Sequence, residues 1–411
     1  MTNPLRPSRR GQRIAFGLLA GVLAAVPARA QTAPVVVDVT FSTSTIERNA
    51  SAMSAAVASL SRVGAAALAA VFPERARARD KRGAALRLLK LALLDVPIVH
   101  FADGLNHEFG HMARADEIGM PLRFHLLGGP WSARRFDLYS PRPGLLDLAS
   151  LGGGFEAELA LERRVWDRAY DPNSLGVADA VTLLDGAMGR FYYVQQDLSG
   201  LRGRPRDDLV YRAGDPTRYL YELLRERGAW TASGDTFAAA RSIRSRSWLN
   251  FADAGLWAQG WNLLKYVSRG DRALATPWLR VRGVGLLPFS QFHLSPVGPQ
   301  TAVGTRYRAG ASGGEFLFRW TDGIRGSRLV GTGFSWFSAS GTVVHPRLRA
   351  DLWRGMDRTL GARVEAGATA VRWPSRRAAL QLAVGAKSAG YVLGLPQKRG
   401  VYVETGLRLM F

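Results

Sequence analysis

Residues 401–411 read VYVETGLRLMF, and their side chains alternate between two kinds. The odd-numbered positions are mostly apolar: Val401, Val403, Thr405, Leu407, Leu409 and Phe411. The even-numbered positions are more polar: Tyr402, Glu404, Gly406, Arg408 and Met410. Because successive side chains of a β-strand point to opposite faces, we predict a strand with one apolar face.

The same alternation recurs back along the chain to about residue 277. Eight segments carry it: 279–287, 303–309, 316–320, 329–338, 347–353, 363–370, 380–384 and 401–411. Their second face carries charged residues among glycines and alanines: Arg306, Arg308, Arg319, Arg347, Arg349, Asp351, Arg363, Glu365, Glu404 and Arg408. An even strand number and a lumen of small and mutually pairing side chains are typical of narrow barrels. Residues 277–411 are therefore predicted to form an eight-stranded antiparallel β-barrel.

Alternation also fits a water-soluble barrel or sandwich whose apolar face points inward. Tryptophans near the strand ends favour a membrane barrel instead: Trp320, Trp336, Trp353 and Trp373. An alternating last strand that ends in Phe411 resembles the C-terminal signature of Gram-negative outer-membrane barrels. The resemblance implies outer-membrane lipid as a partner. With both barrel ends on one side of the membrane, the long outer loops are expected at 288–300 and 387–400.

The first thirty residues have the pattern of a secretory signal peptide. Arginines precede an apolar stretch at 14–26, and the small-residue ending Ala28-Arg29-Ala30 suits cleavage before Gln31. The apolar stretch is short for a membrane span, although an uncleaved anchor is the alternative. We therefore expect an exported protein, with its barrel in the outer membrane and the preceding domain facing the periplasm.

Composition limits the chemistry that is available. The 411 residues include no cysteine, so any metal must be held by histidines and carboxylates. The formal charge is +22, but the arginines are scattered and no basic run is interleaved with aromatic residues. We therefore expect no nucleic-acid partner, and a basic exported protein suits anionic lipid head groups.

Between residues 42 and 270 the apolar positions recur at helical spacing. The clearest predicted helices are 44–71, 82–94, 176–198, 216–227 and 248–267, and a short hairpin is expected within 121–139. The fold class is thus α+β and multidomain. A signal peptide at 1–30 precedes a mostly α-helical domain at 31–270, which is followed by the barrel at 277–411.

Residues 107–111 read His-Glu-Phe-Gly-His, an H-E-x-x-H motif. On a helix, His107 and His111 lie on one face, so both imidazoles can reach one ion with Glu108 beside it. A helix with two structural histidines is the alternative, but a glycine at position 110 of a helix needs a packing or ligand-access reason. The motif resembles the helix of zinc metallopeptidases. That resemblance implies Zn²⁺ bound by His107 and His111, with Glu108 as the general base.

A catalytic zinc site usually has three protein ligands. Residues 152–162, GGGFEAELALE, offer Glu156, Glu158 and Glu162, and this layout is similar to the gluzincins, whose third ligand is a glutamate on a later helix. The glycines would let the chain approach closely before that helix begins. We favour Glu156 as the third ligand, with the other two glutamates as alternatives.

Five further residues have candidate roles of lower weight. Asp103 and Asn106 are candidates for orienting the imidazoles, although Asp103 is equally suited to cap the helix. His125 and the tyrosines Tyr192 and Tyr193 are candidate oxyanion donors, with structural roles as the alternative.

The motif and the leader together predict a zinc-dependent metallopeptidase of the bacterial envelope that acts on a peptide or protein substrate. The edge of the predicted hairpin could hold an extended peptide as an added strand. One alternative is another zinc hydrolase, such as an amidase. A second is a non-proteolytic outer-membrane protein with a structural or vestigial metal site. A third, of lower weight, is a basic protein that binds nucleic acid.

Overall fold

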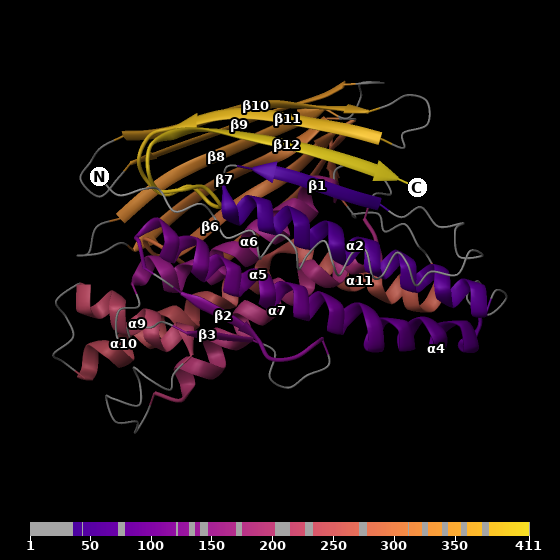
Figure 1. Cartoon of the computed structure of the whole chain (residues 1–411), viewed down its shortest axis with the longest axis horizontal. Helices are drawn as coiled ribbons and strands as arrows, with labels where there is room; N and C mark the ends of the chain where they lie inside the picture. Colours follow the sequence, from indigo (N-terminus) through magenta and orange to yellow (C-terminus); the bar gives the residue numbers. More distant parts are fainter. Residues whose placement is uncertain are drawn as a thin grey trace.

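One large antiparallel sheet lies over a layer of helices in the computed structural model (Figure 1). The structure describes residues 36–42, 44–72, 79–120, 122–130, 136–139, 147–169, 175–201, 214–226, 233–270, 278–310, 312–322, 328–338, 344–354, 360–371 and 378–410. The predicted signal peptide, Trp373 and Phe411 lie outside these residues.

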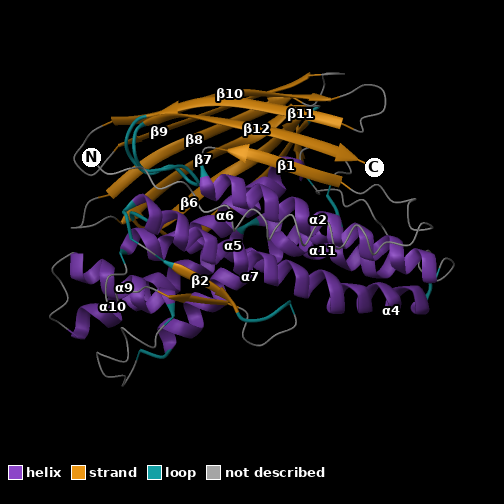
Figure 2. Ribbon diagram, in the orientation of Figure 1, coloured by secondary structure: helices purple, strands orange, loops and turns teal. Residues whose placement is uncertain are grey.

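The helical region precedes the sheet in the sequence, as predicted. Its elements are α2 (Thr45–Val71), α4 (Lys81–Lys90), the π-helical turn η2 (Leu91–Asp95), α5 (Val96–Glu117), α6 (Leu148–Ala169), α7 (Val177–Ser199), α9 (Asp215–Glu226), α10 (Ser233–Ser247), the 3-10 helix η3 (Trp248–Ala252) and α11 (Ala254–Arg269). The expected hairpin is formed by β2 (Arg123–Leu126) and β3 (Phe136–Tyr139). Figure 2 shows this hairpin at the level of α9 and α10, in the part of the helical layer away from the large sheet.

The C-terminal region supplies nine strands of the sheet rather than eight. They are β4 (Leu279–Val281), β5 (Val284–Ser295), β6 (Gly298–Ala309), β7 (Ser312–Asp322), β8 (Arg328–Ser338), β9 (Val344–Arg354), β10 (Leu360–Val371), β11 (Ala378–Lys387) and β12 (Gly400–Met410). Each pairs with the next, and the tenth strand, β1 (Val36–Ser42), pairs with β12. This N-terminal edge strand lies within the region expected to be helical.

Two sequence expectations at the start of the sheet are wrong. The predicted segment 279–287 is broken by a tight turn, because Arg282 and Gly283 have φ values of 49° and 84°. The predicted outer loop 288–300 is instead strand, apart from a two-residue turn between β5 and β6. Pro288 is tolerated within β5, because one side of the strand has no strand neighbour there.

The described strands do not close into the predicted barrel, because no ladder joins the edge strands β1 and β4. The helical layer covers the free edge of β5 instead. Asn250 of η3 accepts a hydrogen bond from the Phe292 backbone N–H at 2.7 Å, and Tyr219 of α9 donates to the Ser295 carbonyl at 2.7 Å. A sheet edge satisfied in this way is not open to another strand.

The segment between β11 and β12, expected to be an outer loop, folds back onto the helices. Its residues Tyr391, Val392 and Leu395 are buried against Trp353. The Leu395 carbonyl accepts a hydrogen bond at 3.0 Å from Arg114 of α5. The segment therefore packs inward because its apolar side chains are buried there. Trp353 is a core residue rather than part of an aromatic girdle.

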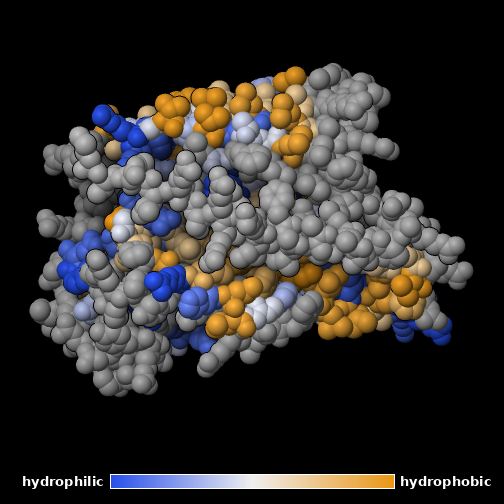
Figure 3. Space-filling view, viewed as in Figure 1, coloured by the Kyte–Doolittle hydropathy of each residue, from blue (hydrophilic) through white to orange (hydrophobic). Residues whose placement is uncertain are grey.

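The two faces of the sheet have the reverse of the polarity expected in a water-soluble sandwich. The face away from the helices exposes large apolar side chains, including Val303, Phe316, Phe318, Leu352, Val364, Leu380, Leu382, Val401 and Val403. Figure 3 shows apolar residues along this outward side. The face toward the helices buries charged residues: Arg306, Arg319, Arg349, Asp351, Arg363, Glu365 and Glu404. This distribution matches the one that strands of membrane barrels show.

Helix α6 occupies the space beneath the polar face, and ion pairs connect it to the sheet. Arg164 of α6 donates to both carboxylate oxygens of Glu404 at 2.9 and 2.6 Å and to Glu47 of α2 at 3.0 Å. Arg349 of β9 reaches Asp167 of α6 at 2.5 Å. The charges of the inner face are thus paired, as predicted, and a helix fills the interior.

We predict that Arg164→Ala lowers the free energy of unfolding by about 3–5 kcal/mol, since buried Glu47 would lose its cationic partner and buried Glu404 would keep only Arg347. Chemical denaturation in detergent, followed by circular dichroism, measures the change. The matched control is Arg241→Ala, because Arg241 is an exposed helical arginine and its loss should change stability by less than about 0.5 kcal/mol. Equal effects of the two variants would contradict the role assigned to Arg164.

Candidate metal centre

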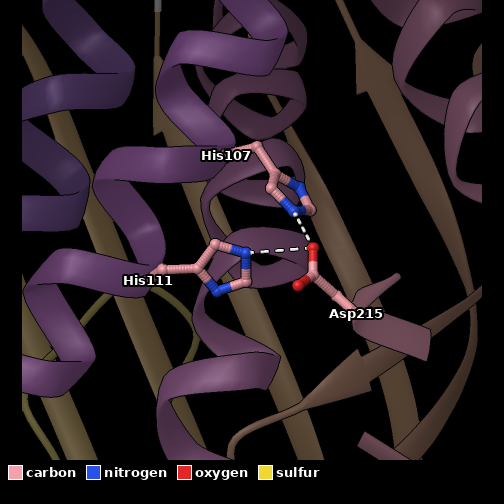
Figure 4. Close-up of side chains that lie close together, drawn as sticks. All are labelled: His107, His111 and Asp215. Atoms are coloured by element: carbon pink, nitrogen blue, oxygen red, sulfur yellow. Dashed lines mark hydrogen bonds and ion pairs between the residues drawn. The ribbon is translucent and has the colours of Figure 1, made fainter. Parts of the chain in front are cut away.

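Three side chains from two helices converge on one point (Figure 4). The Nε2 atoms of His107 and His111 lie 3.2 and 3.3 Å from Oδ2 of Asp215. One ligand atom from each residue lies within 4.8 Å of the other two. The two histidines occupy successive turns of α5, as the motif predicts, and Asp215 is the first residue of α9.

Helix α6 fixes the orientation of both imidazoles. Nδ1 of His107 lies 2.5 Å from Oε1 of Glu158, and Nδ1 of His111 lies 2.7 Å from the carbonyl oxygen of Ser150. A carbonyl oxygen can only accept, so His111 carries a proton on Nδ1. This arrangement turns both Nε2 atoms toward Asp215, in the way that outer-shell groups orient metal-binding histidines.

The electrostatics of the cluster favour a positive charge between the three residues. Burial alone lowers the pKa of His107, but Glu158 and Asp215 outweigh burial and hold that pKa well above its ordinary value. Burial likewise lowers the pKa of His111, and Asp215 reverses the shift. Burial raises the pKa of Asp215, whereas the two imidazoles hold it well below its usual range.

The donor set fits a divalent metal ion. Without a metal, the raised pKa values mean that protonated imidazoles donate to the Asp215 carboxylate. A divalent cation would take the place of these Nε2 protons, with the remaining proton of each ring on Nδ1. Two histidine nitrogens and one carboxylate oxygen, without sulfur, are ligands that Zn²⁺ accepts in catalytic sites.

Gly153 and Gly154 of α6, together with Gly110 of α5, let the two helices approach closely enough to build this centre. A Cβ atom on Gly154 would lie 2.5 Å from Nε2 of His107, and one on Gly153 would lie 2.4 Å from the carbonyl oxygen of Gly110. A Cβ on Gly110 would in turn lie 2.1 Å from the Gly153 carbonyl. The glycines are inside α6, not before it as expected, because this close contact outweighs their cost of about 1 kcal/mol each in a helix.

Glu156, the predicted third ligand, lies away from the histidines. Its two carboxylate oxygens accept hydrogen bonds from Arg114 at 2.7 and 2.5 Å, and one also accepts from the Gly394 backbone N–H at 2.7 Å. Helical periodicity explains the difference. Ser150, Gly154 and Glu158 recur every four residues and share the face toward the histidines, whereas a residue two positions from Gly154 faces elsewhere.

The other two candidate glutamates have different partners. Glu158 contacts His107 through Nδ1, so it lies behind the imidazole rather than among the converging ligand atoms. Glu162 pairs with Arg190 of α7 at 2.5 Å. Asp215 therefore occupies the place expected for a glutamate. Its sequence signal was weak, because an acidic residue before proline at a helix start is common without any ligand role.

Glu108, the predicted general base, is half-buried on α5 beside the cluster. Its charge contributes to raising the pKa of His111, although less than that of Asp215. Glu108 is therefore close to the converging ligand atoms without being one of the three residues that supply them.

The remaining candidates are only partly brought to the centre. Asp103 is buried within α5 and does not cap it, since the helix begins at Val96. Asn106 donates to the Ala157 carbonyl at 2.6 Å, which joins α5 to α6. Tyr193 donates to Oδ2 of Asp215 at 3.0 Å and accepts from the Asp215 backbone N–H at 2.9 Å, so it positions this carboxylate. Tyr192 and His125 are exposed.

We predict that Gly154→Ala weakens metal binding by at least about tenfold, because the added methyl group displaces the His107 imidazole. Isothermal titration with Zn²⁺ measures the affinity. Gly189→Ala on α7 is the matched control, since no atom lies within 4 Å of the added Cβ and metal binding should be unchanged. Unaltered affinity in Gly154→Ala would show that the contact does not position His107.

A second prediction identifies the third ligand. Asp215→Ala should weaken Zn²⁺ binding by more than the roughly 10- to 100-fold that loss of an outer-shell partner causes. Glu156→Gln should leave the affinity unchanged and instead lower stability, because Arg114 loses its buried carboxylate partner. Both variants are compared on folded protein after size-exclusion chromatography. The reverse result would restore Glu156 as the ligand.

Comparison with known proteins adds little to this description. No family model matches the sequence, and no curated protein matches it. A solved structure described as "De novo design of transmembrane beta-barrels" matches 32% of this chain and 98% of its own, with 14% sequence identity and a TM-score of 0.14. A TM-score this low does not establish a shared fold.

Proposed function

We propose that this protein is a zinc-dependent hydrolase of peptide bonds, with His107, His111 and Asp215 as the metal ligands. The observation that carries the proposal is the convergence of both Nε2 atoms on the Asp215 carboxylate, with both Nδ1 atoms engaged by α6. One ligand atom of each residue therefore faces a common point, as metal ligands do.

Each residue of the centre has a role in the proposed reaction. When bound, Zn²⁺ would supply a Lewis acid that polarises water and a substrate carbonyl. Glu108 is the base that accepts the proton of the attacking water and passes it to the leaving amine. Glu158 and Ser150 keep the imidazoles in one tautomer, and Tyr193 holds the Asp215 carboxylate in place.

Substrate would approach from the side of α9. The Asp215 side chain is 20% exposed, compared with 8% and 4% for His107 and His111, so the cluster is reached past Asp215. The β2–β3 hairpin lies beside the motif, since the Phe124 ring is 5.6 Å from the ring of Phe109. Within the described residues β2 pairs only with β3, and an extended peptide could add to this hairpin as a strand.

The sheet is the proposed membrane anchor of the enzyme. Its outer face exposes aliphatic and aromatic side chains while its charged face is buried against α6, which suits contact with lipid on the outside. Together with the signal peptide predicted at 1–30, this favours the outer membrane of a Gram-negative bacterium, with the proposed metal centre on the periplasmic side.

The mechanism predicts separate effects on binding and on chemistry. Glu108→Gln should keep Zn²⁺ affinity but lower the hydrolysis rate by about 100-fold or more, since general-base catalysis contributes factors of this order. The rate is measured with randomised, internally quenched peptides, before and after metal removal by a chelator. Asp116→Asn, an exposed carboxylate on the same helix, is the matched control and should retain activity.

Full activity of Glu108→Gln would remove Glu108 from the mechanism. If the protein binds Zn²⁺ but cleaves no peptide in any form, the site is structural or acts on another substrate class, and the peptidase proposal fails.

A further inference from the structure

The helical layer has a second large apolar surface that the proposed hydrolase does not use. We name it the α4–α11 face, and its residues are between 41% and 64% exposed: Leu88, Leu89, Leu93, Val96, Trp257, Trp261 and Leu264. Helices α4 and α11 are neighbours, since Arg87 donates to the Val267 carbonyl at 2.9 Å. Figure 3 shows apolar residues at the end of the molecule where Figure 1 places α4.

Charged groups lie on the inner side of the same helices. Lys90 and Asp95 form an ion pair at 2.7 Å, with side chains only 3% and 0% exposed. Ser61 of α2 donates to the same carboxylate at 2.7 Å. A helix in water normally buries its apolar stripe and exposes its charges. The α4–α11 face therefore has the inverted polarity of a surface in contact with hydrocarbon.

Basic and aromatic residues border the exposed apolar residues of α4 and η2. Lys81 and Arg82 are exposed at the start of α4, and Arg269 is exposed at the end of α11, which lies beside that start. Trp257 lies near the other end of α11, and Trp261 lies one turn further along, at the middle of the helix. Basic residues near anionic head groups and tryptophans at an interface are typical of membrane-contacting helices.

The length of the stripe sets how deeply it can reach. From Ala85 to Val96 it covers eleven residue steps, or about 17 Å at 1.5 Å per residue. This is about half of the roughly 30 Å hydrocarbon core. The neighbouring helix α2 is long and apolar enough to cross a membrane, and Gly64 of α2 packs directly against Leu94.

We infer that the α4–α11 face lies in the hydrocarbon of a phospholipid bilayer, with Lys81, Arg82 and Arg269 at the level of the phosphates. Lipid is the occupant because the sheet of the same chain has the same inverted polarity, and because basic residues border the apolar stripe. The helical region is then partly embedded, rather than wholly periplasmic as the sequence suggested.

The absence of cysteine makes a direct test possible, because a single introduced cysteine is the only thiol. Leu93→Cys and Leu264→Cys are labelled with an environment-sensitive fluorophore, and the full chain is reconstituted into vesicles of phosphatidylcholine and phosphatidylglycerol. Quenching by lipids with spin labels on their acyl chains is compared with quenching by aqueous iodide. All labelled positions are exposed, so the core is left intact.

Two further positions serve as references. Leu352→Cys reports on the outer face of the sheet, and Leu126→Cys on the hairpin is as exposed as Leu88 but lies outside the α4–α11 face. We expect labels at 93, 264 and 352 to lose most of their fluorescence to the lipid quencher and little to iodide. The label at 126 should show the opposite.

Each other outcome overturns the inference. Iodide quenching at 93 and 264 would mean that water covers the face, and protection from both quenchers would mean that protein covers it. Lipid quenching at 352 alone would leave the sheet placement standing while this inference fails. If lipid quenches none of the three labels, neither the sheet nor the α4–α11 face lies in the bilayer. The proposed hydrolysis is measured separately, so its failure would be distinguishable from this result.

Discussion

The buried ion pairs between α6 and the inner face of the sheet are the constraint on which the rest of the structure depends. Buried charges are strongly unfavourable unless they are paired. Arg164 must therefore meet Glu404 and Glu47, and Asp167 must meet Arg349. These pairs fix both the rotation and the height of α6 beneath the sheet. Every other face of α6 then has a defined neighbour.

The candidate metal centre depends on that placement. Once α6 is fixed, Gly153 brings the backbone of α5 into contact at Gly110, and the stripe of Ser150, Gly154 and Glu158 meets the two histidines. Asp215, the first residue of α9, completes the cluster and accepts a hydrogen bond from Tyr193. The ligand atoms are thus oriented by groups that take no direct part in binding, which is the arrangement that gives a metal site its geometry.

Several features could be predicted from the sequence because they repeat a local period. The alternation at 401–411 and the motif at 107–111 each encode one face of one element, and both predictions of secondary structure are confirmed. The position of Asp215 could not be found in this way, because it depends on where α9 packs against α5. Glu156 was favoured for its place after the glycines, although its helical phase directs it to Arg114.

The number of strands and the closure of the sheet also depended on non-local contacts. Strand β1 is only seven residues long, and its partner strand lies more than 350 residues away. Its pairing with β12 therefore could not be recognised from the sequence. The free edge of β5 is satisfied by Asn250 of η3, so the chain does not need a strand there. Counting alternating segments could not reveal that helices, rather than strands, cover this edge.

The segment that folds back between β11 and β12 makes completion of the helical region depend on folding of the last strands. Its Gly394 N–H and Leu395 carbonyl complete the Glu156–Arg114 pair, over sequence separations of 238 and 281 residues. Arg114 lies one helical turn beyond His111, so the ligand helix keeps an incompletely satisfied guanidinium until the final hairpin has docked. Synthesis proceeds from the N-terminus, so the partners of Arg114, on the helix that carries His107 and His111, are complete only after the last strands have been made.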